Sequence, residues 1–376
     1  MPDQLCLLDD VQVAGPASTE ALPSEIVVGG RRLRPTVVFD TYWRFAAARQ
    51  AVYEARRRGV PGPWTSDPII RQHRFTNCFR AADRVSQYLI RDVSYAGSQE
   101  PEEVFFRTLL FKVFNRISTW RLLVDAFGGI SWQGYDYTRY DQVLGDAFAR
   151  GERLYSAAYV VPPPALGEDR KHSNHLRLIE MMMKTKAAAR VRDAGSMRVA
   201  FEVLREYPAI GDFLAYQYLI DLNYSSVLDY DEMEFVVPGP GARDGIRKCF
   251  GAAAIGIEAD VIRYMADHQE EHFSRLGLGF VRLEGRPLQL IDCQNLFCEV
   301  DKYARVAHPE IAGHSGRTRI KQKFQPVSEP VPAWFPPKWG INDSGPSGVA
   351  ASTGTSTYVF RQPAASSLPR EAVGFW

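Results

Sequence analysis

Apolar and aromatic residues recur every three or four positions along most of this chain, whereas the alternating runs typical of β-strands are rare. Between Phe39 and Arg58, for example, aromatic side chains three and four residues apart fall on one face of a helix. The chain has 376 residues, of which 45% are hydrophobic and 24% charged, a composition typical of globular proteins. We therefore expect a mainly α fold with few short strands.

The same periodicity predicts where the helices lie. We expect helical stretches over residues 39–58, 68–93, 104–127, 140–151, 172–192, 197–206, 244–250, 257–277 and 294–306. We also expect a turn and a helix over 208–224, and a short strand or extended piece over 288–291. Residues 1–35 mix proline, glycine, serine and acids and are predicted to be a flexible leader. Residues 36–341 are predicted to form a catalytic helical domain of two lobes that binds a modified base, and residues 342–376 a disordered tail.

Several classes of protein are excluded by composition. The five cysteines are odd in number and lack CxxC spacing, so we expect no disulfide framework and a reducing, cytoplasmic location. No apolar run is long enough to span a membrane. His172 and His175 lie three residues apart without further ligands at diagnostic spacing, so no metal or cofactor is expected. A net charge of +1 permits a basic face but not a strongly basic protein.

The segment Leu204–Ala215 predicts two helices joined by a tight turn. Pro208 and Gly211 form the turn, and Asp212 caps the second helix. A helix N-terminus with free backbone N–H groups binds anions, including a DNA phosphate. The segment is similar to the helix–hairpin–helix element of DNA glycosylases, so Gly211 and Asp212 are candidate contacts to the DNA backbone. An ordinary corner between two helices fits the pattern equally well.

A glycine-rich turn precedes Asp244, which we expect to open a helix. In the glycosylases that the hairpin resembles, a catalytic aspartate begins a later helix, so Asp244 is a candidate to stabilise an oxocarbenium-like sugar or to orient water. The separation from Gly211 is longer here than in those enzymes, and a helix N-cap is the alternative role. The candidate contacts to DNA phosphates in this segment are Gly239, Gly241, Arg243 and Lys248.

A second polar cluster follows Leu290. Asp292, Asn295 and Glu299 are spaced so that they share one helix face. Amides and carboxylates arranged in this way suit reading of the hydrogen-bonding edge of a base taken out of the stack. We therefore assign Gln294, Asn295 and Glu299 to a base pocket and keep Asp292 as a second candidate catalytic residue. The alternative is a capped helix with a solvated face.

A third cluster lies between Arg74 and Arg91. Arginines interleaved with aromatic residues suit contact with a DNA backbone, which makes Arg74 and Arg84 candidates. Asn77 and Asp83 are candidate base-pocket residues, although an interior salt-bridge network around Asp83 is at least as consistent with the pattern. Tyr137 belongs to an aromatic-rich stretch that could line the pocket, although such stretches are more often part of the core.

Taken together, eight blocks of sequence resemble the helical domain of the 5-hydroxymethyluracil DNA kinases and their stand-alone relatives. The blocks are 42–46, 63–68, 74–77, 83–88, 208–217, 221–224, 238–243 and 292–295. The relatives include amino acid:DNA transferases, also called α-glutamyl/putrescinyl-thymine pyrophosphorylases, and an anti-phage DNA glycosylase that excises glucosylated hydroxymethylcytosine. The resemblance covers about residues 38–341.

The resemblance implies that the chain reads modified pyrimidines in DNA. In the kinases this domain is joined to a P-loop domain, and because this sequence has no P-loop motif we do not expect phosphorylation. Two chemistries remain: excision of the modified base, which we favour, and transfer of an amino acid or polyamine to pyrophosphorylated 5-hydroxymethyluracil. A module that binds modified DNA without chemistry is a third alternative. The expected partner is double-stranded DNA that carries modified pyrimidines, and the expected state is a monomer.

Overall fold

Fourteen α-helices and one β-hairpin make up most of the regular structure of residues 21–157, 161–325 and 332–342, which the computed structural model describes. The helices are α1 (Val37–Arg57), α2 (Pro68–Gln72), α3 (Arg84–Tyr88), α4 (Pro101–Phe114), α5 (Ile117–Phe127), α6 (Tyr137–Ala149), α7 (Lys171–Lys184), α8 (Ala187–Arg192), α9 (Met197–Arg205), α10 (Asp212–Asn223), α11 (Pro240–Phe250), α12 (Glu258–Asp267), α13 (Gln269–Arg275) and α14 (Leu290–Ala307). The predicted mainly α fold is confirmed.

The hairpin lies within the stretch predicted to be a flexible leader. Strands β1 (Ile26–Val28) and β2 (Arg31–Leu33) pair antiparallel, with Ile26 opposite Leu33. Alternating residues of β1 and the end of β2 are buried, so the prediction of a loose leader is wrong for residues 26–33. Residues 1–20 and the predicted tail from 343 onward lie outside the described residues.

Four predicted helical stretches are interrupted in the structure. In the stretch 68–93, α2 ends at Gln72 and α3 begins only at Arg84. Asn115 and Lys186 adopt left-handed backbone conformations (φ 48° and 57°), which divide the stretches 104–127 and 172–192 into two helices each. The stretch 257–277 divides at His268. The strand predicted over 288–291 does not form, because α14 begins at Leu290 and a capping box joins Gln289 to Asp292.

Helices α11 and α14 pack unusually closely. An added Cβ on Gly245 would lie 2.2 Å from the backbone oxygen of Phe297, and one on Gly241 would lie 3.0 Å from Cys298 Sγ. Only glycine permits the approach at Gly245, where the obstacle is backbone, so this glycine fixes the position of α14.

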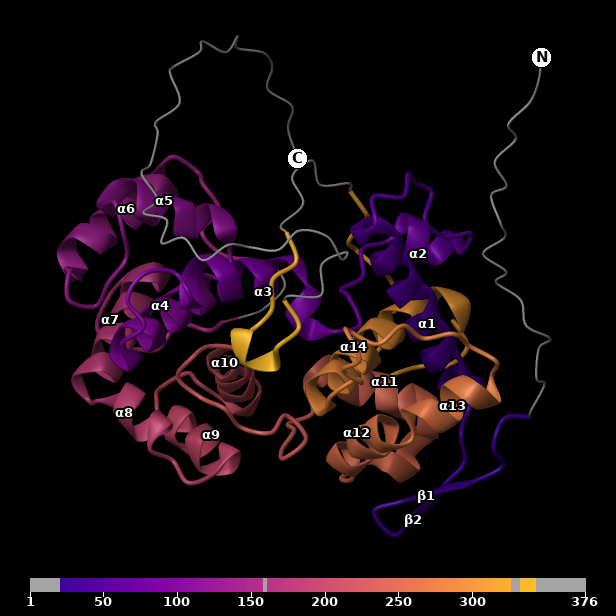
Figure 1. Ribbon diagram of the computed structural model, residues 1–376. Helices are drawn as coiled ribbons and strands as arrows, with labels where there is room; N and C mark the ends of the chain where they lie inside the picture. The colour runs from indigo at the N-terminus through magenta and orange to yellow at the C-terminus, as the bar shows by residue number, and fades with distance from the viewer. Residues whose placement is uncertain (1–20, 158–160, 326–331, 343–376) are drawn as a thin grey trace, which may run out of the picture. The chain divides into compact units, whose positions relative to one another are not determined.

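Figure 1 shows two sets of helices on either side of α10. One set contains α4 to α9, and the other contains α1, α2 and α11 to α14, in which α1 and α14 lie against each other. All described residues belong to one unit of the chain, which ends at Asn342. Among them, no helix is long and apolar enough to cross a membrane.

Candidate functional site

A polar cavity of about 310 Å³ lies where α3, α4, α10 and α14 meet. We call it the polar cavity. Its volume is at the lower end of the range of about 300–1,000 Å³ that is usual for small-molecule sites. Acids, cations, amides and hydroxyls all contribute to its lining, and Phe213 and Cys298 add apolar surface. The charged residues of the lining are Asp83, Asp221, Glu299, Arg74, Lys112 and Lys302.

The polar cavity has a fixed buried ion cluster in its wall. Asp221 of α10 is buried and accepts from Arg80 at 2.7 Å and pairs with Lys112 at 2.8 Å. The two cations hold the pKa of this carboxyl below its ordinary value, although burial alone would raise it. Asp221 therefore stays ionised and ties α10 to α4 and to the segment before α3.

A second, larger cavity of about 920 Å³ lies beneath α1, and we call it the arginine cavity. Its cations are Arg49, Arg56, Arg57, Arg71, Arg74, Arg84 and Lys323. Trp64 and Phe324 also line it, and the Arg56 guanidinium lies 5.1 Å from the centre of the Trp64 ring and 5.9 Å from that of Phe324. Asp83 is the single carboxylate among the described residues of its lining.

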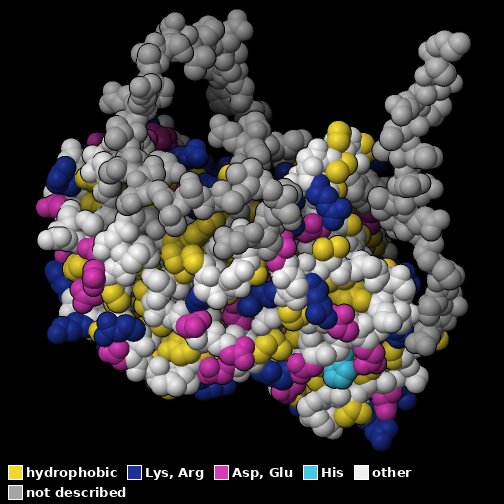
Figure 2. Space-filling model, in the orientation of Figure 1, with side chains coloured by type: hydrophobic (Ala, Val, Ile, Leu, Met, Phe, Trp, Pro, Cys, Tyr) yellow, Lys and Arg dark blue, Asp and Glu magenta, His cyan; other side chains and the backbone are white. Residues whose placement is uncertain are grey.

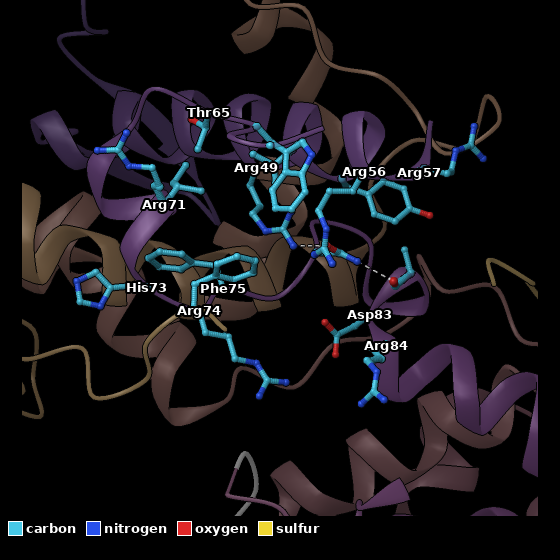
Figure 3. Close-up of a pocket in the computed structure, with 18 of the residues that line it drawn as sticks. Arg49, Arg56, Arg57, Thr65, Arg71, His73, Arg74, Phe75, Asp83 and Arg84 are labelled. Atoms are coloured by element: carbon cyan, nitrogen blue, oxygen red, sulfur yellow. Dashed lines mark hydrogen bonds between the residues drawn. The ribbon is translucent and has the colours of Figure 1, made fainter. Parts of the chain in front are cut away.

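Figure 3 shows how these side chains are arranged. Arg49 and Arg56 extend from α1 toward the middle of the cavity, whereas Arg57 and Arg71 lie toward its two ends. Basic and acidic side chains are interspersed over the face shown in Figure 2, so the concentration of positive charge is a property of the cavity and not of that face.

The two cavities have Arg74 and Asp83 in common. Asp83 precedes α3, its carboxylate makes no cap to that helix, and no ion pair to it occurs among the described residues. Arg74 is exposed, and its backbone N–H donates to the carbonyl of Gln322, which brings Lys323 to the arginine cavity. A ligand that entered both cavities would therefore pass Asp83.

Two of the three predicted base-pocket residues of α14 line the polar cavity, and the third lies behind them and contacts one of them. Asn295 and Glu299 line the polar cavity. Glu299 accepts from the Thr76 N–H at 3.1 Å and pairs with Lys302 at 2.6 Å. Gln294 is buried beneath the lining and donates to Asn295 Oδ1 at 3.2 Å, so it orients Asn295 instead of meeting a ligand.

Asp292 is not in either cavity. It is buried, and its carboxylate accepts from the backbone N–H groups of Arg80 and Gln289 at 2.7 and 3.0 Å. Burial raises its pKa to about 6, against the opposing effect of these hydrogen bonds. Asp292 is therefore part of the cap of α14, which is the alternative interpretation of this residue.

Asp244 lies one turn inside α11 and does not open the helix as predicted, because the helix begins at Pro240. Its carboxylate accepts from the backbone N–H of Ser315 at 2.9 Å and also from the Ser315 hydroxyl, and it pairs with Arg317 at 3.4 Å. These bonds lower its pKa, although burial opposes them. Asp244 lines neither cavity, so it anchors the segment that follows α14.

Three further predicted residues have structural roles in the core. Lys248 is 2% exposed and pairs with Asp301 at 3.0 Å, so it does not reach a phosphate in this structure. An added Cβ on Gly239 would lie 2.7 Å from the Phe213 ring, so helix packing accounts for this glycine, as it does for Gly241. Arg243 is exposed on α11 and remains a candidate phosphate contact.

The predicted hairpin joins α9 to α10. Gly211 and Asp212 are exposed, Asp212 pairs with Arg205 at 2.7 Å, and Phe213 lines the polar cavity one residue later. A contact of this turn with DNA stays a prediction. Tyr137 lies under the guanidinium of Arg177 at 3.3 Å and lines neither cavity, so its place in a base pocket stays a prediction.

Asn77 lines the arginine cavity, but its amide is already engaged. Its Oδ1 accepts from Arg49, and its Nδ2 donates to the carbonyl of Ala82 at 2.7 Å. Asn77 therefore positions Arg49 and holds the backbone just before Asp83. Arg84 also lines this cavity, and its contact with a DNA backbone stays a prediction.

Sequence reasoning missed the cations of α1 and the cluster around Asp221. Arg49 and Arg56 are seven residues apart, a spacing that places them on one helix face, but only the aromatic and apolar residues of this helix entered the prediction. Lys112 lies in the apolar second half of α4, between Phe111 and Val113, and this placement was the available signal. No group of three or more potential metal ligands occurs among the described residues.

The chain resembles known proteins that act on DNA. The pattern of one protein family, described as "5-hmdU DNA kinase, helical domain", matches residues 36–313. The chain is 26% identical over 288 residues to the 5-hmdU DNA kinase of Bacillus phage SP10, an alignment that covers 71% of this chain and 45% of that protein. The chain thus spans less than half the length of that relative. No solved structure matches it significantly.

Proposed function

Because the chain belongs to the family of the 5-hmdU DNA kinase helical domain, we propose that it binds DNA carrying a modified pyrimidine and acts on that base after extruding it from the duplex. The observation that carries the proposal is the pair of cavities that share Arg74 and Asp83. One cavity supplies positive charge for phosphates, and the other supplies amide and carboxylate groups for the edge of a base.

We place the extruded base in the polar cavity. Asn295 offers a donor and an acceptor in one amide, and Glu299 offers an acceptor, so the two can read the edge of a pyrimidine. Phe213 provides an aromatic surface at the same cavity. The exposed cations Arg71, Arg74 and Lys323 are the proposed contacts to the flanking phosphates.

The reaction that we propose first is hydrolysis of the N-glycosidic bond, which leaves an abasic site. The bond between the sugar C1′ and the base nitrogen breaks, the electron pair leaves with the base, and water adds to C1′ as its proton passes to a carboxylate. We assign this carboxylate to Asp83, because it borders both cavities and is not held in an ion pair. The proposed substrate is a hypermodified pyrimidine of phage DNA, such as glucosylated 5-hydroxymethylcytosine, and the proposed role is anti-phage defence.

The second candidate is the transferase reaction. An amine would attack the 5-methylene carbon of a pyrophosphorylated 5-hydroxymethyluracil, and the bond from that carbon to the pyrophosphate oxygen would break. The excess of cations over carboxylates in the arginine cavity favours it, since these cations would neutralise the leaving pyrophosphate.

Nucleoside and free-base analysis tests both reactions. Purified protein is incubated with glucosylated or 5-hydroxymethylated phage DNA, and separately with pyrophosphorylated DNA plus an amine. Alkali-labile abasic sites and a released base support hydrolysis, whereas release of pyrophosphate with a new amine adduct supports transfer. If neither product forms on any of these DNAs although the protein still binds them, both reactions are contradicted. The remaining interpretation is then a module that binds modified DNA without chemistry.

The assignment of Asp83 is tested with Asp83→Asn. We expect turnover to fall at least about 100-fold while DNA affinity changes little, because general acid–base groups contribute 10²–10⁴. The matched control is Asp193→Asn, which alters an exposed carboxylate that lines neither cavity. Turnover by Asp83→Asn equal to that of the control would remove Asp83 from the mechanism.

A further inference from the structure

Arg49 is a buried cation that makes no ion pair with a carboxylate among the described residues. Its side chain is 7% exposed, and one of its amino groups donates to Asn77 Oδ1. The other amino group, Nη1, has no hydrogen-bond partner among the described residues. Burying a charged group is costly, and here burial lowers the pKa of Arg49. The charges of Asp83 and Glu299 oppose this lowering, and the charge of Arg56 adds to it.

Three other buried polar atoms of the arginine cavity also lack a hydrogen-bond partner among the described residues. They are Tyr53 Oη, His73 Nδ1 and Arg84 Nε. Buried polar atoms in proteins are nearly always paired, so several unpaired atoms in one cavity indicate that a ligand completes them. Arg49 and Arg56 extend into the same space, where two like charges repel unless an anion lies between them (Figure 3).

We propose that the inner part of the arginine cavity is a phosphate-binding site built on Arg49. A guanidinium presents paired N–H groups that match two oxygens of a phosphate, and Asn77 fixes the plane of Arg49 for that contact. Arg56 and Arg84 supply further charge and donors. Asp83, the single acid of the described lining, is shared with the polar cavity. Arg57 is paired with Glu284 at 2.6 Å, so the positive excess of the arginine cavity comes from its other cations.

The phosphate has two possible sources with the same chemistry. It is either a diester of the DNA backbone drawn in beside an extruded nucleotide, or a terminal phosphate or pyrophosphate group on a smaller molecule or on a modified base. The inference rests on the cavity and does not require either reaction proposed above.

Direct binding measurements without turnover test the site. Sodium pyrophosphate is titrated into the protein by calorimetry, and binding of an unmodified duplex oligonucleotide is followed by fluorescence anisotropy at fixed salt. Both are repeated with Arg49→Met, with Arg84→Met as a second variant, and with the control Arg192→Met, an exposed arginine on α8. Circular dichroism checks that each variant is folded.

We expect Arg49→Met to lower the affinity for at least one of the two ligands tenfold or more. Arg84→Met should lower the affinity for the same ligand by a smaller factor. The affinities of Arg192→Met should stay within twofold of those of the wild type. Weakened binding of pyrophosphate identifies a terminal phosphate group, and a loss confined to duplex DNA identifies a backbone phosphate. Unchanged affinity for both ligands in folded Arg49→Met, or in folded Arg84→Met if Arg49→Met does not fold, overturns the proposal.

Discussion

Replacing Gly245 by alanine tests whether the close contact of α11 and α14 sets the geometry of the polar cavity. The new Cβ would lie 2.2 Å from the Phe297 oxygen and 2.8 Å from its carbonyl carbon. Since ordinary contacts of a Cβ are longer than 3 Å, the two helices must separate by roughly 1 Å, or the backbone must deform. The obstacle is main chain and cannot rotate away.

The expected cost follows from two opposing terms. Overpacking of a core costs typically 1–3 kcal/mol, and the upper part of that range applies because the obstacle is backbone. Against this cost, alanine in a helix interior stabilises the helix by about 1 kcal/mol relative to glycine. We therefore expect Gly245→Ala to lower the free energy of unfolding by about 2 kcal/mol, measured by urea denaturation followed by circular dichroism.

The matched control is Gly145→Ala in α6. There the new Cβ would meet Arg170 Nη1 at 2.6 Å, the far end of a flexible side chain that can move aside. The control should be as stable as wild type or about 1 kcal/mol more stable. Because α14 carries Asn295 and Glu299, Gly245→Ala should also weaken binding of modified DNA. A Gly245→Ala protein as stable as the control would refute this account of the helix contact.

Three further predictions concern buried carboxyls. Asp221→Asn removes the carboxylate that neutralises two buried cations, and we expect urea denaturation to show a loss of about 3–5 kcal/mol, whereas no loss would contradict the ion cluster. Asp244→Asn should lower the free energy of unfolding by about 1–3 kcal/mol in the same assay, because it removes hydrogen bonds to Ser315. Turnover per folded molecule should not change, since Asp244 lines neither cavity. Loss of turnover in folded protein would show that Asp244 takes part in the reaction. Burial raises the pKa of Glu232 to about 7, so the folded state binds its proton more tightly than the unfolded state, and its contribution to stability falls as pH rises from about 4.5 to 7. Glu232→Gln should remove roughly 3 kcal/mol of that fall in urea denaturation between pH 4 and 8, and parallel pH profiles for variant and wild type would contradict it.

Much of the helical architecture was readable from sequence, because a helix is specified by local spacing. The limits of α1 and α9 agree with the predicted stretches to within two residues. The breaks at Asn115 and Lys186 were not readable, since either residue is tolerated in a helix interior and only the packing of the flanking helices requires a left-handed residue there.

The candidate site was predictable only in part. Asp83, Asn295 and Glu299 were expected near a base, and all three line the polar cavity. Asp244 and Asp292 were expected to be catalytic because of their positions at predicted helix starts, yet a carboxylate at such a position satisfies backbone or side-chain donors just as well. Sequence gives the position of a carboxylate along a helix but not the partner that it meets.

By itself, the sequence determined the helical class, the membership of a DNA-modification family and the residue types available for chemistry. Only the tertiary structure decided which of those residues face a cavity. The two cavities draw their walls from α1, α3, α4, α10 and α14, which are far apart in the chain. Local periodicity fixes which face of each helix is apolar, but the close packing of α11 on α14 and the ion cluster around Asp221 fix how those faces meet. That long-range geometry is what leaves Asp83 between a basic and a polar cavity and leaves Nη1 of the buried Arg49 without a hydrogen-bond partner among the described residues.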